Sequence, residues 1–190
     1  MSERRERMRR IRRDRRREAR KNRSIKKIFR GILGWIVAVF AAAILGYGFV
    51  TFCYRTVYMS GSSMSPTISD GEKCVVSRLS YVLGEPDRYD IVAYKQRDDG
   101  SSYYDIKRVI GLPGETVLIE DGRIYIDGEE LTDMPVSDYI FTGGLAETGY
   151  TLGDDEYFLL GDNLNNSRDS RYVNIGSITE SEILGKVVRY

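Results

Sequence analysis

Several hydroxyl side chains lie close together between Gly61 and Thr67, where the sequence reads GSSMSPT. A serine hydroxyl is a poor nucleophile until a neighbouring base takes its proton. The chain contains no histidine, which excludes a Ser-His-Asp triad, a Cys-His pair and the common His-ligated zinc site. If a serine of this segment is a nucleophile, its base must therefore be Asp, Glu, Lys, Tyr or a terminal amine.

Lysine is the natural substitute for histidine, provided that its amine is neutral, and burial in an apolar pocket favours the neutral form. Beyond residue 30 the chain has only Lys73, Lys95, Lys107 and Lys186. Lys107 fits best, because in the strand-like run IKRVI it points away from Arg108 and shares a face with Val109. The alternative for Lys107 is a solvated lysine on an edge strand.

Charge is distributed unevenly along the chain. Residues 1–30 carry 16 Lys or Arg and 4 Asp or Glu, whereas the net charge of the whole chain is only +1, so the remaining residues are strongly acidic. The two parts are separated by Gly31–Tyr54, which has no formal charge and is long enough to cross a hydrocarbon core of about 30 Å as a helix. The pattern predicts a basic cytoplasmic tail (1–30), a transmembrane anchor (31–54) and an extracytoplasmic domain (55–190).

The basic tail is open to two interpretations, because such an arm can bind nucleic acid or the inner leaflet of a membrane. Its direct continuation into the apolar run favours the lipid bilayer as partner and argues against nucleic acid. A cleaved signal peptide is a rival for the apolar run, with small residues at Ala41–Ala43. The run exceeds the usual apolar region of about 7 to 15 residues, so we expect a retained anchor.

Short strands are expected after the apolar run, at Lys73–Ser77, Asp90–Tyr94, Ile106–Ile110, EYFLL and around Lys186–Tyr190. Arg97–Ser102 is expected to be a polar turn. VLIE and RIYID alternate apolar and polar residues on either side of Asp121-Gly122, a strong hairpin signal. Residues 131–155 show weak periodicity and predict a loop-rich insertion. No outer segment has sustained helical periodicity, so we expect a mainly antiparallel β domain. Cys53 and Cys74 are expected to be free thiols, and the alternative is one disulfide bridge between them.

Three motifs, in order, carry a resemblance to a known family. They are Ser63-Met64-Ser65-Pro66-Thr67, the run Lys107 to Glu115 (KRVIGLPGE), and Gly161-Asp162-Asn163 with Asn166 to Arg171 (NSRDSR). Together they resemble the bacterial, single-anchor type I signal peptidases, membrane-bound serine proteases that remove signal peptides from exported proteins. Three motifs in order are far more specific than one.

The resemblance implies Ser63 as the nucleophile and Lys107 as its base. It further implies that Ser167 hydrogen-bonds the Lys107 amine, and that Asp162, Asp169 and Arg171 brace the site from behind. Some relatives have a serine for the oxyanion hole where this chain has Gly61, so the hole is expected to use the Ser63 backbone N–H with a nearby hydroxyl such as Ser62 or Ser60. Met64 is expected to wall a substrate pocket or, alternatively, to fill the core.

The mechanism implied is acyl transfer without a metal or organic cofactor. The partners implied are precursor proteins that bear signal peptides, bound as extended strands with small residues before the cleavage site. Ser63 lies nine residues beyond Tyr54, which places it within about 30 Å of the end of the anchor.

A membrane-tethered β domain that binds a ligand without catalysis is the alternative function. Penicillin-binding and β-lactamase-like enzymes would need Ser-x-x-Lys, which is absent beyond the tail. A sortase-like enzyme would need histidine. Neither the set of precursors nor the oligomeric state can be inferred from the sequence.

Overall fold

A computed structural model describes residues 30–82, 84–98, 101–136 and 138–190. The expected basic tail, residues 1–30, lies outside the described residues except for Arg30. The chain divides into two compact units, Met1–Val50 and Thr51–Tyr190.

The first described element is a helix from Arg30 to Cys53, one residue earlier at each end than the apolar run Gly31–Tyr54. Among the described residues it is the one helix that is long and apolar enough to cross a membrane. Its residues from Arg30 to Phe52 are all exposed, including Trp35 and Phe40. An exposed apolar surface of this extent is what a lipid-facing segment requires.

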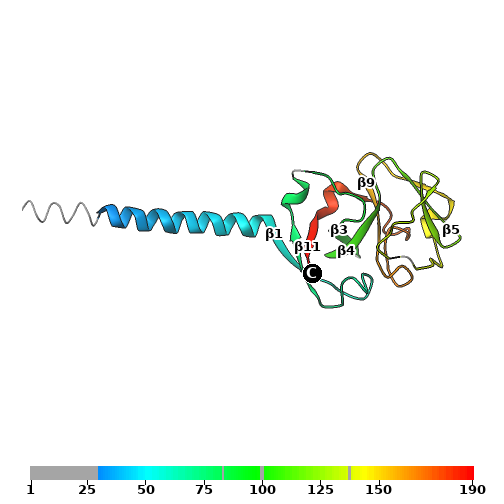
Figure 1. Cartoon of the computed structure of the whole chain (residues 1–190), viewed down its shortest axis with the longest axis horizontal. Coiled ribbons are helices and arrows are strands. Elements are labelled where there is room, and N and C mark those ends of the chain that lie inside the picture. The colour runs from blue at the N-terminus through cyan, green and yellow to red at the C-terminus, as the bar shows by residue number, and fades with distance from the viewer. Residues whose placement is uncertain (1–29, 83, 99–100, 137) are drawn as a thin grey trace, which may run out of the picture. The chain divides into compact units, whose positions relative to one another are not determined.

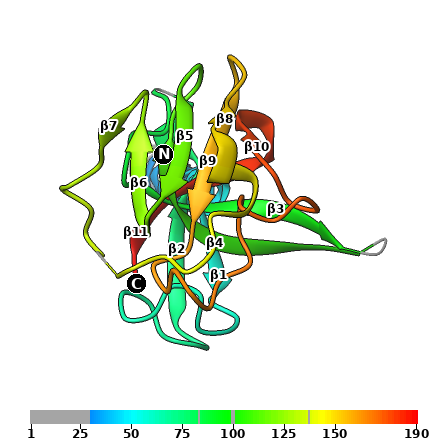
Figure 2. The ribbon, with the colours of Figure 1, turned by 90° about the vertical axis from the view of Figure 1, so that its right-hand side faces the viewer.

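Antiparallel strands dominate the second unit (Figure 1). A seven-stranded sheet has the order β1-β2-β11-β3-β4-β9-β10. The bounds of its strands are Tyr54–Tyr58 for β1, Lys73–Ser77 for β2, Ile91–Asp98 for β3, Ser101–Gly111 for β4, Glu156–Leu160 for β9, Ile178–Thr179 for β10 and Ile183–Arg189 for β11. β3 pairs over its whole length with residues 101–108 of β4, and the two strands form the long hairpin of Figure 2. Lys107 pairs with Val92 of β3, and from the next residue onward β4 also pairs with β9, so Lys107 lies on an inner strand of the sheet.

A smaller four-stranded sheet has the order β7-β6-β5-β8. Its strands are Thr116–Glu120 (β5), Arg123–Ile126 (β6), Glu129–Glu130 (β7) and Tyr150–Thr151 (β8). The β5–β6 turn is the expected one: Asp121 and Gly122 both have positive φ, 49° and 75°. Two consecutive positive φ values match the right-handed twist of a hairpin, which explains the Asp-Gly pair.

One apolar cluster joins the two sheets. Ile110 of β4 and Phe158 and Leu160 of β9 pack with Val117 and Ile119 of β5. Gly111 lies at this junction, where a Cβ would clash with the side chains of Val117, Leu152 and Phe158. The close approach therefore needs a residue without a side chain at that position.

The mainly antiparallel β fold with one apolar N-terminal helix is confirmed. Most strands differ from the expected ones only in length. The turn expected at Arg97–Ser102 is shorter, since β3 continues to Asp98 and β4 begins at Ser101. β1 and the two-residue strands β7, β8 and β10 were not expected, because β1 continues directly from the helix and a two-residue strand has no periodicity.

The segment 131–155 is loop-rich, as expected, but contains a short 3-10 helix (Gly144–Thr148) and β8. Two further 3-10 helices occupy Leu79–Tyr81 and Glu180–Glu182. Cys53 and Cys74 are buried free thiols. Burial and the nearby Glu72 raise the pKa of the Cys74 thiol, which favours its unreactive protonated form.

Candidate active site

Ser63 lies on the loop between β1 and β2, and this loop is held down by its apolar residues. Met64 and Ile68 are fully buried against β2, β3 and β4, and the Ile68 N–H donates to the Met64 carbonyl at 2.9 Å. The Ser63 carbonyl accepts a hydrogen bond from the Asn163 N–H at 2.9 Å. Apolar burial on one side and a backbone hydrogen bond on the other thus fix the position of Ser63.

The Lys107 amine reaches Ser63 from β4. Lys107 Nζ lies 2.9 Å from Ser63 Oγ, although 44 residues separate the two in sequence. The lysine side chain is 1% exposed, and its amine also donates to the Ile106 carbonyl at 3.2 Å. The structure therefore brings together the two residues that the sequence analysis paired, within the distance over which a proton can be transferred.

Asp105 is a third member of this group, and sequence reasoning missed it. Its Oδ2 accepts from Lys107 Nζ at 2.6 Å, so the amine is in an ion pair rather than in a purely apolar pocket. The signal was available: residues two apart in a strand share a face, and the argument that placed Val109 beside Lys107 applies equally to Asp105.

Asp162 braces the site through Arg108, the next residue on β4. Arg108 Nε and a terminal nitrogen contact the two carboxylate oxygens of Asp162 at 2.7 and 2.6 Å. Thr67 Oγ1 also donates to Asp162. Both charged side chains are buried. Through Thr67 and Arg108, Asp162 connects the β1–β2 loop and β4 to the segment after β9.

Asp169 and Arg171 form a second buried pair. Arg171 Nε donates to Asp169 Oδ1 at 2.8 Å, and the other carboxylate oxygen accepts from the Gly161 N–H at 3.2 Å. Arg171 also donates to the carbonyls of Thr142 and Leu164, at 3.2 and 2.5 Å. These contacts hold together the loop that carries Asn163.

Ser167 departs from expectation, since its hydroxyl makes no hydrogen bond to Lys107. Its Oγ is buried and without a partner, next to Gly161 and near the Ser63 carbonyl, where a Cβ on Gly161 would clash with both. The Lys107 amine instead contacts Ser63 Oγ, Asp105 Oδ2 and the Ile106 carbonyl.

The three residues expected to form the oxyanion hole differ in their hydrogen bonds. Gly61 adopts a positive φ of 81°, and its N–H is taken by Asp70 Oδ1 at 2.7 Å, so Gly61 cannot donate to an oxyanion in this state. Ser62 Oγ accepts from Asn166 Nδ2 at 2.9 Å, which leaves the Ser62 hydroxyl proton available. Among the hydrogen bonds of the described residues, none uses the Ser63 N–H.

Met64 packs in the core rather than lining an open pocket. Its side chain is fully buried in the cluster that includes Cys74, Val76 and Ile106. The second of the two expectations for Met64, a core-filling role, describes its position.

Among the described residues, no cluster of three or more Cys, Asp or Glu side chains is arranged to hold a metal ion. A hydroxyl beside an amine, with free N–H and O–H donors next to it, can perform nucleophilic attack on a carbonyl.

Residues 32–190 match the family described as "Signal peptidase, peptidase S26". This chain belongs to the signal peptidase family. Its relatives include a probable signal peptidase I-2 of Synechocystis sp., 36% identical over 76% of this chain and 66% of the relative. The signal peptidase I T of Bacillus subtilis is 33% identical over 86% of both chains. A crystal structure of a signal peptidase I from Enterococcus faecalis, 29% identical, covers 55% of this chain and 97% of the other with a TM-score of 0.44.

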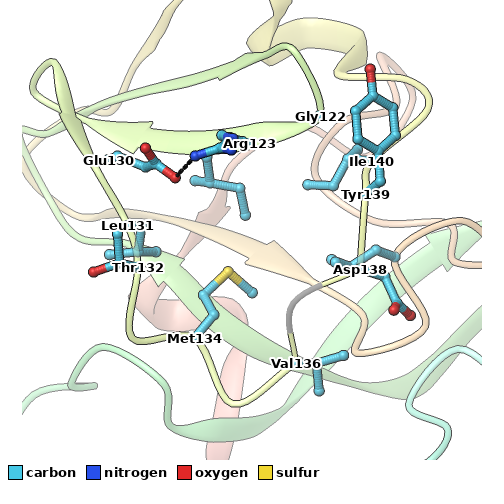
Figure 3. A pocket seen from close by; sticks show the side chains of 12 residues that line it. Gly122, Arg123, Glu130, Leu131, Thr132, Met134, Val136, Asp138, Tyr139 and Ile140 are labelled. Atoms are coloured by element: carbon cyan, nitrogen blue, oxygen red, sulfur yellow. Dashed lines mark hydrogen bonds and ion pairs between the residues drawn. The ribbon is translucent and has the colours of Figure 1, made fainter.

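This signal peptidase family member also has a separate cavity of about 410 Å³ (Figure 3). The cavity lies between the β5–β6 hairpin and the segment from Leu131 to Ile140. Met134 and Ile140 contribute apolar surface, and the Arg123–Glu130 ion pair lies at its edge. Neither Ser63 nor Lys107 lines it. The first part of the insertion therefore forms the wall of a cavity that is distinct from the Ser63–Lys107 pair.

Proposed function

We propose that the protein is a membrane-anchored serine endopeptidase that removes signal peptides from exported precursors, with Ser63 as nucleophile and Lys107 as general base. The observation that carries the proposal is the 2.9 Å contact between Lys107 Nζ and Ser63 Oγ in a chain of the signal peptidase family. Relatives that share 31 to 36% of their residues with this chain are named signal peptidase I.

The first chemical step is attack on the scissile carbonyl. Neutral Lys107 accepts the hydroxyl proton of Ser63, and the Ser63 oxygen forms a bond to the carbonyl carbon. The tetrahedral intermediate collapses when the peptide C–N bond breaks, and Lys107 returns the proton to the leaving amine. Water then attacks the acyl-enzyme with Lys107 again as base, which releases the signal peptide and regenerates Ser63.

Negative charge develops on the scissile carbonyl oxygen in the transition state, and hydrogen-bond donors must stabilise it. The unused Ser63 N–H is the first donor that we assign, and the Ser62 hydroxyl is the second, since it already accepts from Asn166 and retains its own proton. Donors that are fixed in place before the reaction cost no reorganisation, which makes such a hole effective.

The anchor and the site suggest an orientation. The charge-rich tail 1–30 would stay on the cytoplasmic side and the acidic domain would be extracytoplasmic. Ser63 would then lie close to the outer leaflet, where an exported precursor held by its own apolar segment presents its cleavage site. Labelling of cysteines introduced at either end of the helix with a membrane-impermeant reagent tests this orientation.

The direct test is cleavage of a precursor that has small residues at positions −1 and −3, with the full-length protein in detergent or vesicles. Ser63→Ala and Lys107→Met should each abolish cleavage. Lys95→Met serves as the matched control, because Lys95 is an exposed lysine on the adjacent strand β3, and it should cleave at the wild-type rate. Cleavage that persists in Lys107→Met would remove lysine as the base.

A non-catalytic ligand-binding domain on a membrane anchor is the alternative function. It finds no support, since the matching family and the named relatives are peptidases. The same experiment separates the two functions, because a binding domain would be unaffected by Ser63→Ala.

A further inference from the structure

We propose that Asn163 and Asn166 are positioning residues, each of which fixes one of the two donors of the oxyanion hole. Asn166 holds the hydroxyl of Ser62, and Asn163 holds the peptide unit that carries the Ser63 N–H. The proposal rests on the proposed function and deepens it, because it gives a task at the same site to two asparagines for which the family resemblance implied none.

The Ser62 side chain is exposed, so packing alone does not fix its hydroxyl. A free serine side chain is distributed among three staggered rotamers. Asn166 Nδ2 donates to Ser62 Oγ at 2.9 Å, and among the described residues this is the only hydrogen bond that Ser62 Oγ makes. An amide NH2 group can only donate, so this bond uses an acceptor site of the hydroxyl and leaves its proton for a substrate oxygen.

The other donor, the Ser63 N–H, belongs to the same planar peptide unit as the Ser62 carbonyl, and the two point in opposite directions. Contacts that orient the carbonyl therefore orient the N–H as well. The Ser62 carbonyl accepts from Asn163 Nδ2 and from the Ser65 N–H, both at 3.1 Å, so both of its lone pairs are used. Because a carbonyl can only accept, the NH2 group of Asn163 is the group that faces it.

The main chain of Asn163 contacts the nucleophile too. Its N–H donates to the Ser63 carbonyl at 2.9 Å, so Asn163 holds the carbonyls on both sides of the Ser63 N–H. Its neighbours Asp162 and Leu164 are each 2% exposed, and Ser167, which follows Asn166, is also buried. The loop that carries the two amides is thus anchored in the core, and donors that are fixed before the reaction are the effective ones.

The first readout is kcat and KM for precursor cleavage by the full-length protein in detergent micelles. Asn166→Ala, Asn166→Asp and Asn163→Ala are each measured in the wild type, and the two alanine variants are also combined with Ser62→Ala. The second readout is the set of three-bond NMR couplings of isotope-labelled serine, which report the side-chain rotamers of Ser62. Ser62→Ala identifies the Ser62 signal, and this readout requires no activity.

Asn166→Ala should lower kcat by at least about 3-fold with little change in KM, because the freed Ser62 side chain is shared among three rotamers. Asn166→Asp should lower kcat by about 100-fold, as Ser62→Ala does, because an oxygen in place of the NH2 group takes the hydroxyl proton that the oxyanion needs. In Ser62→Ala, Asn166→Ala should cause no further loss. The couplings should indicate one Ser62 rotamer in the wild type and averaged rotamers in Asn166→Ala.

Asn163→Ala should lower kcat by about 10-fold, less than the loss of a whole donor, because the Ser65 N–H still holds the Ser62 carbonyl. Unlike the loss in Asn166→Ala, this loss should persist in Ser62→Ala, since it acts through the Ser63 N–H.

Asn165→Ala is the matched control on the same loop. The Asn165 amide contacts the Tyr139 carbonyl and the Phe141 N–H instead of the serine loop. Its removal should leave kcat and the Ser62 rotamer as they are in the wild type. A loss of kcat in Asn165→Ala equal to that in Asn166→Ala would overturn the inference, because general loosening of the loop would then explain both.

Equal losses from Asn166→Ala with and without the Ser62 hydroxyl would also overturn the role of Asn166, since additivity marks independent sites. So would wild-type kcat in Asn166→Asp, or averaged Ser62 rotamers in the wild type. Wild-type kcat in Asn163→Ala would overturn the role of Asn163. Failure of the wild type to cleave any precursor would contradict the proposed function, and the rotamer measurement would then still decide whether Asn166 fixes Ser62.

Discussion

Arg108 and Asp162 form a buried bidentate ion pair directly behind the Ser63–Lys107 pair, with nitrogen–oxygen distances of 2.7 and 2.6 Å. Arg108 also donates to the Tyr89 carbonyl at 2.8 Å, and Thr67 donates to Asp162. Because Lys107 and Arg108 are adjacent on β4, the strand alternation directs one cation to the nucleophile and the other to the scaffold. A change at Asp162 should therefore affect the fold before it affects the chemistry.

Asp162→Ala should lower the free energy of unfolding by about 3–5 kcal/mol, because it leaves a buried guanidinium without its partner. Arg108 is 7% exposed and Asp162 is 2% exposed, so water cannot compensate. Denaturant unfolding of the full-length protein in micelles measures the loss. Glu130→Gln provides the control, since the Arg123–Glu130 pair is exposed and its removal should leave stability unaltered. Equal effects from the two substitutions would contradict the structural role given to Asp162.

Gly161→Ala should lower kcat/KM by at least about 100-fold, because a misplacement of about 1 Å at reacting groups costs that much. The added Cβ would clash with Ser167 Oγ and with the Ser63 carbonyl, and the second of these is backbone that can only move by displacing the nucleophile. Steady-state kinetics measure the effect. Gly84→Ala is the matched control, since its Cβ would meet only the Ser80 carbonyl at 3.6 Å. A Gly161→Ala enzyme with wild-type kinetics would show that Ser63 tolerates the shift.

Ser62→Ala should lower kcat by about 100-fold with little change in KM, because an oxyanion donor acts mainly in the transition state. Ser60→Ala should have no such effect, although the sequence alone left both hydroxyls as candidates. Only Ser62 is anchored, through the hydrogen bond from Asn166. The comparison of kcat and KM for the two variants decides between them, and a reversed order of effects would place Ser60 in the hole.

Alkaline pH should destabilise the domain in the range from about 10 to 12. Burial and the hydrogen bond to Asp133 raise the pKa of Tyr89 to about 12, and burial raises the pKa of Tyr157 to about 12. An unfolded tyrosine ionises near pH 10, so the unfolded state gains stability from ionisation above that pH while the folded phenols stay protonated. Stability contributed by these phenols is therefore complete below about pH 10 and is lost as the pH approaches 12.

Unfolding midpoints measured across this range should fall for the wild type and fall less steeply for Tyr89→Phe. Tyr58→Phe, at an exposed position, should follow the wild type. An unchanged slope in Tyr89→Phe would remove Tyr89 from the explanation.

Local patterns in the sequence were sufficient for much of the fold. The absence of histidine directed the search to lysine, and period-2 alternation placed Lys107 on a strand, where β4 has it. Asp121-Gly122 specified a hairpin because few residue pairs tolerate two positive φ values. The uncharged run before residue 55 predicted a helix that ends within one residue of the observed position. Each of these features depends on neighbours in the chain.

Contacts between distant segments were decided by the tertiary structure. Ser63 and Lys107 are 44 residues apart, and their oxygen and nitrogen lie 2.9 Å apart because Met64 and Ile68 pack against the sheet and the Asn163 N–H holds the Ser63 carbonyl. The preference of the Lys107 amine for Asp105 over Ser167 was also beyond the motifs, because it depends on which of two acceptors the three-dimensional arrangement brings within reach. Sequence named the groups that do the chemistry, and the folded chain set the charge environment in which they act.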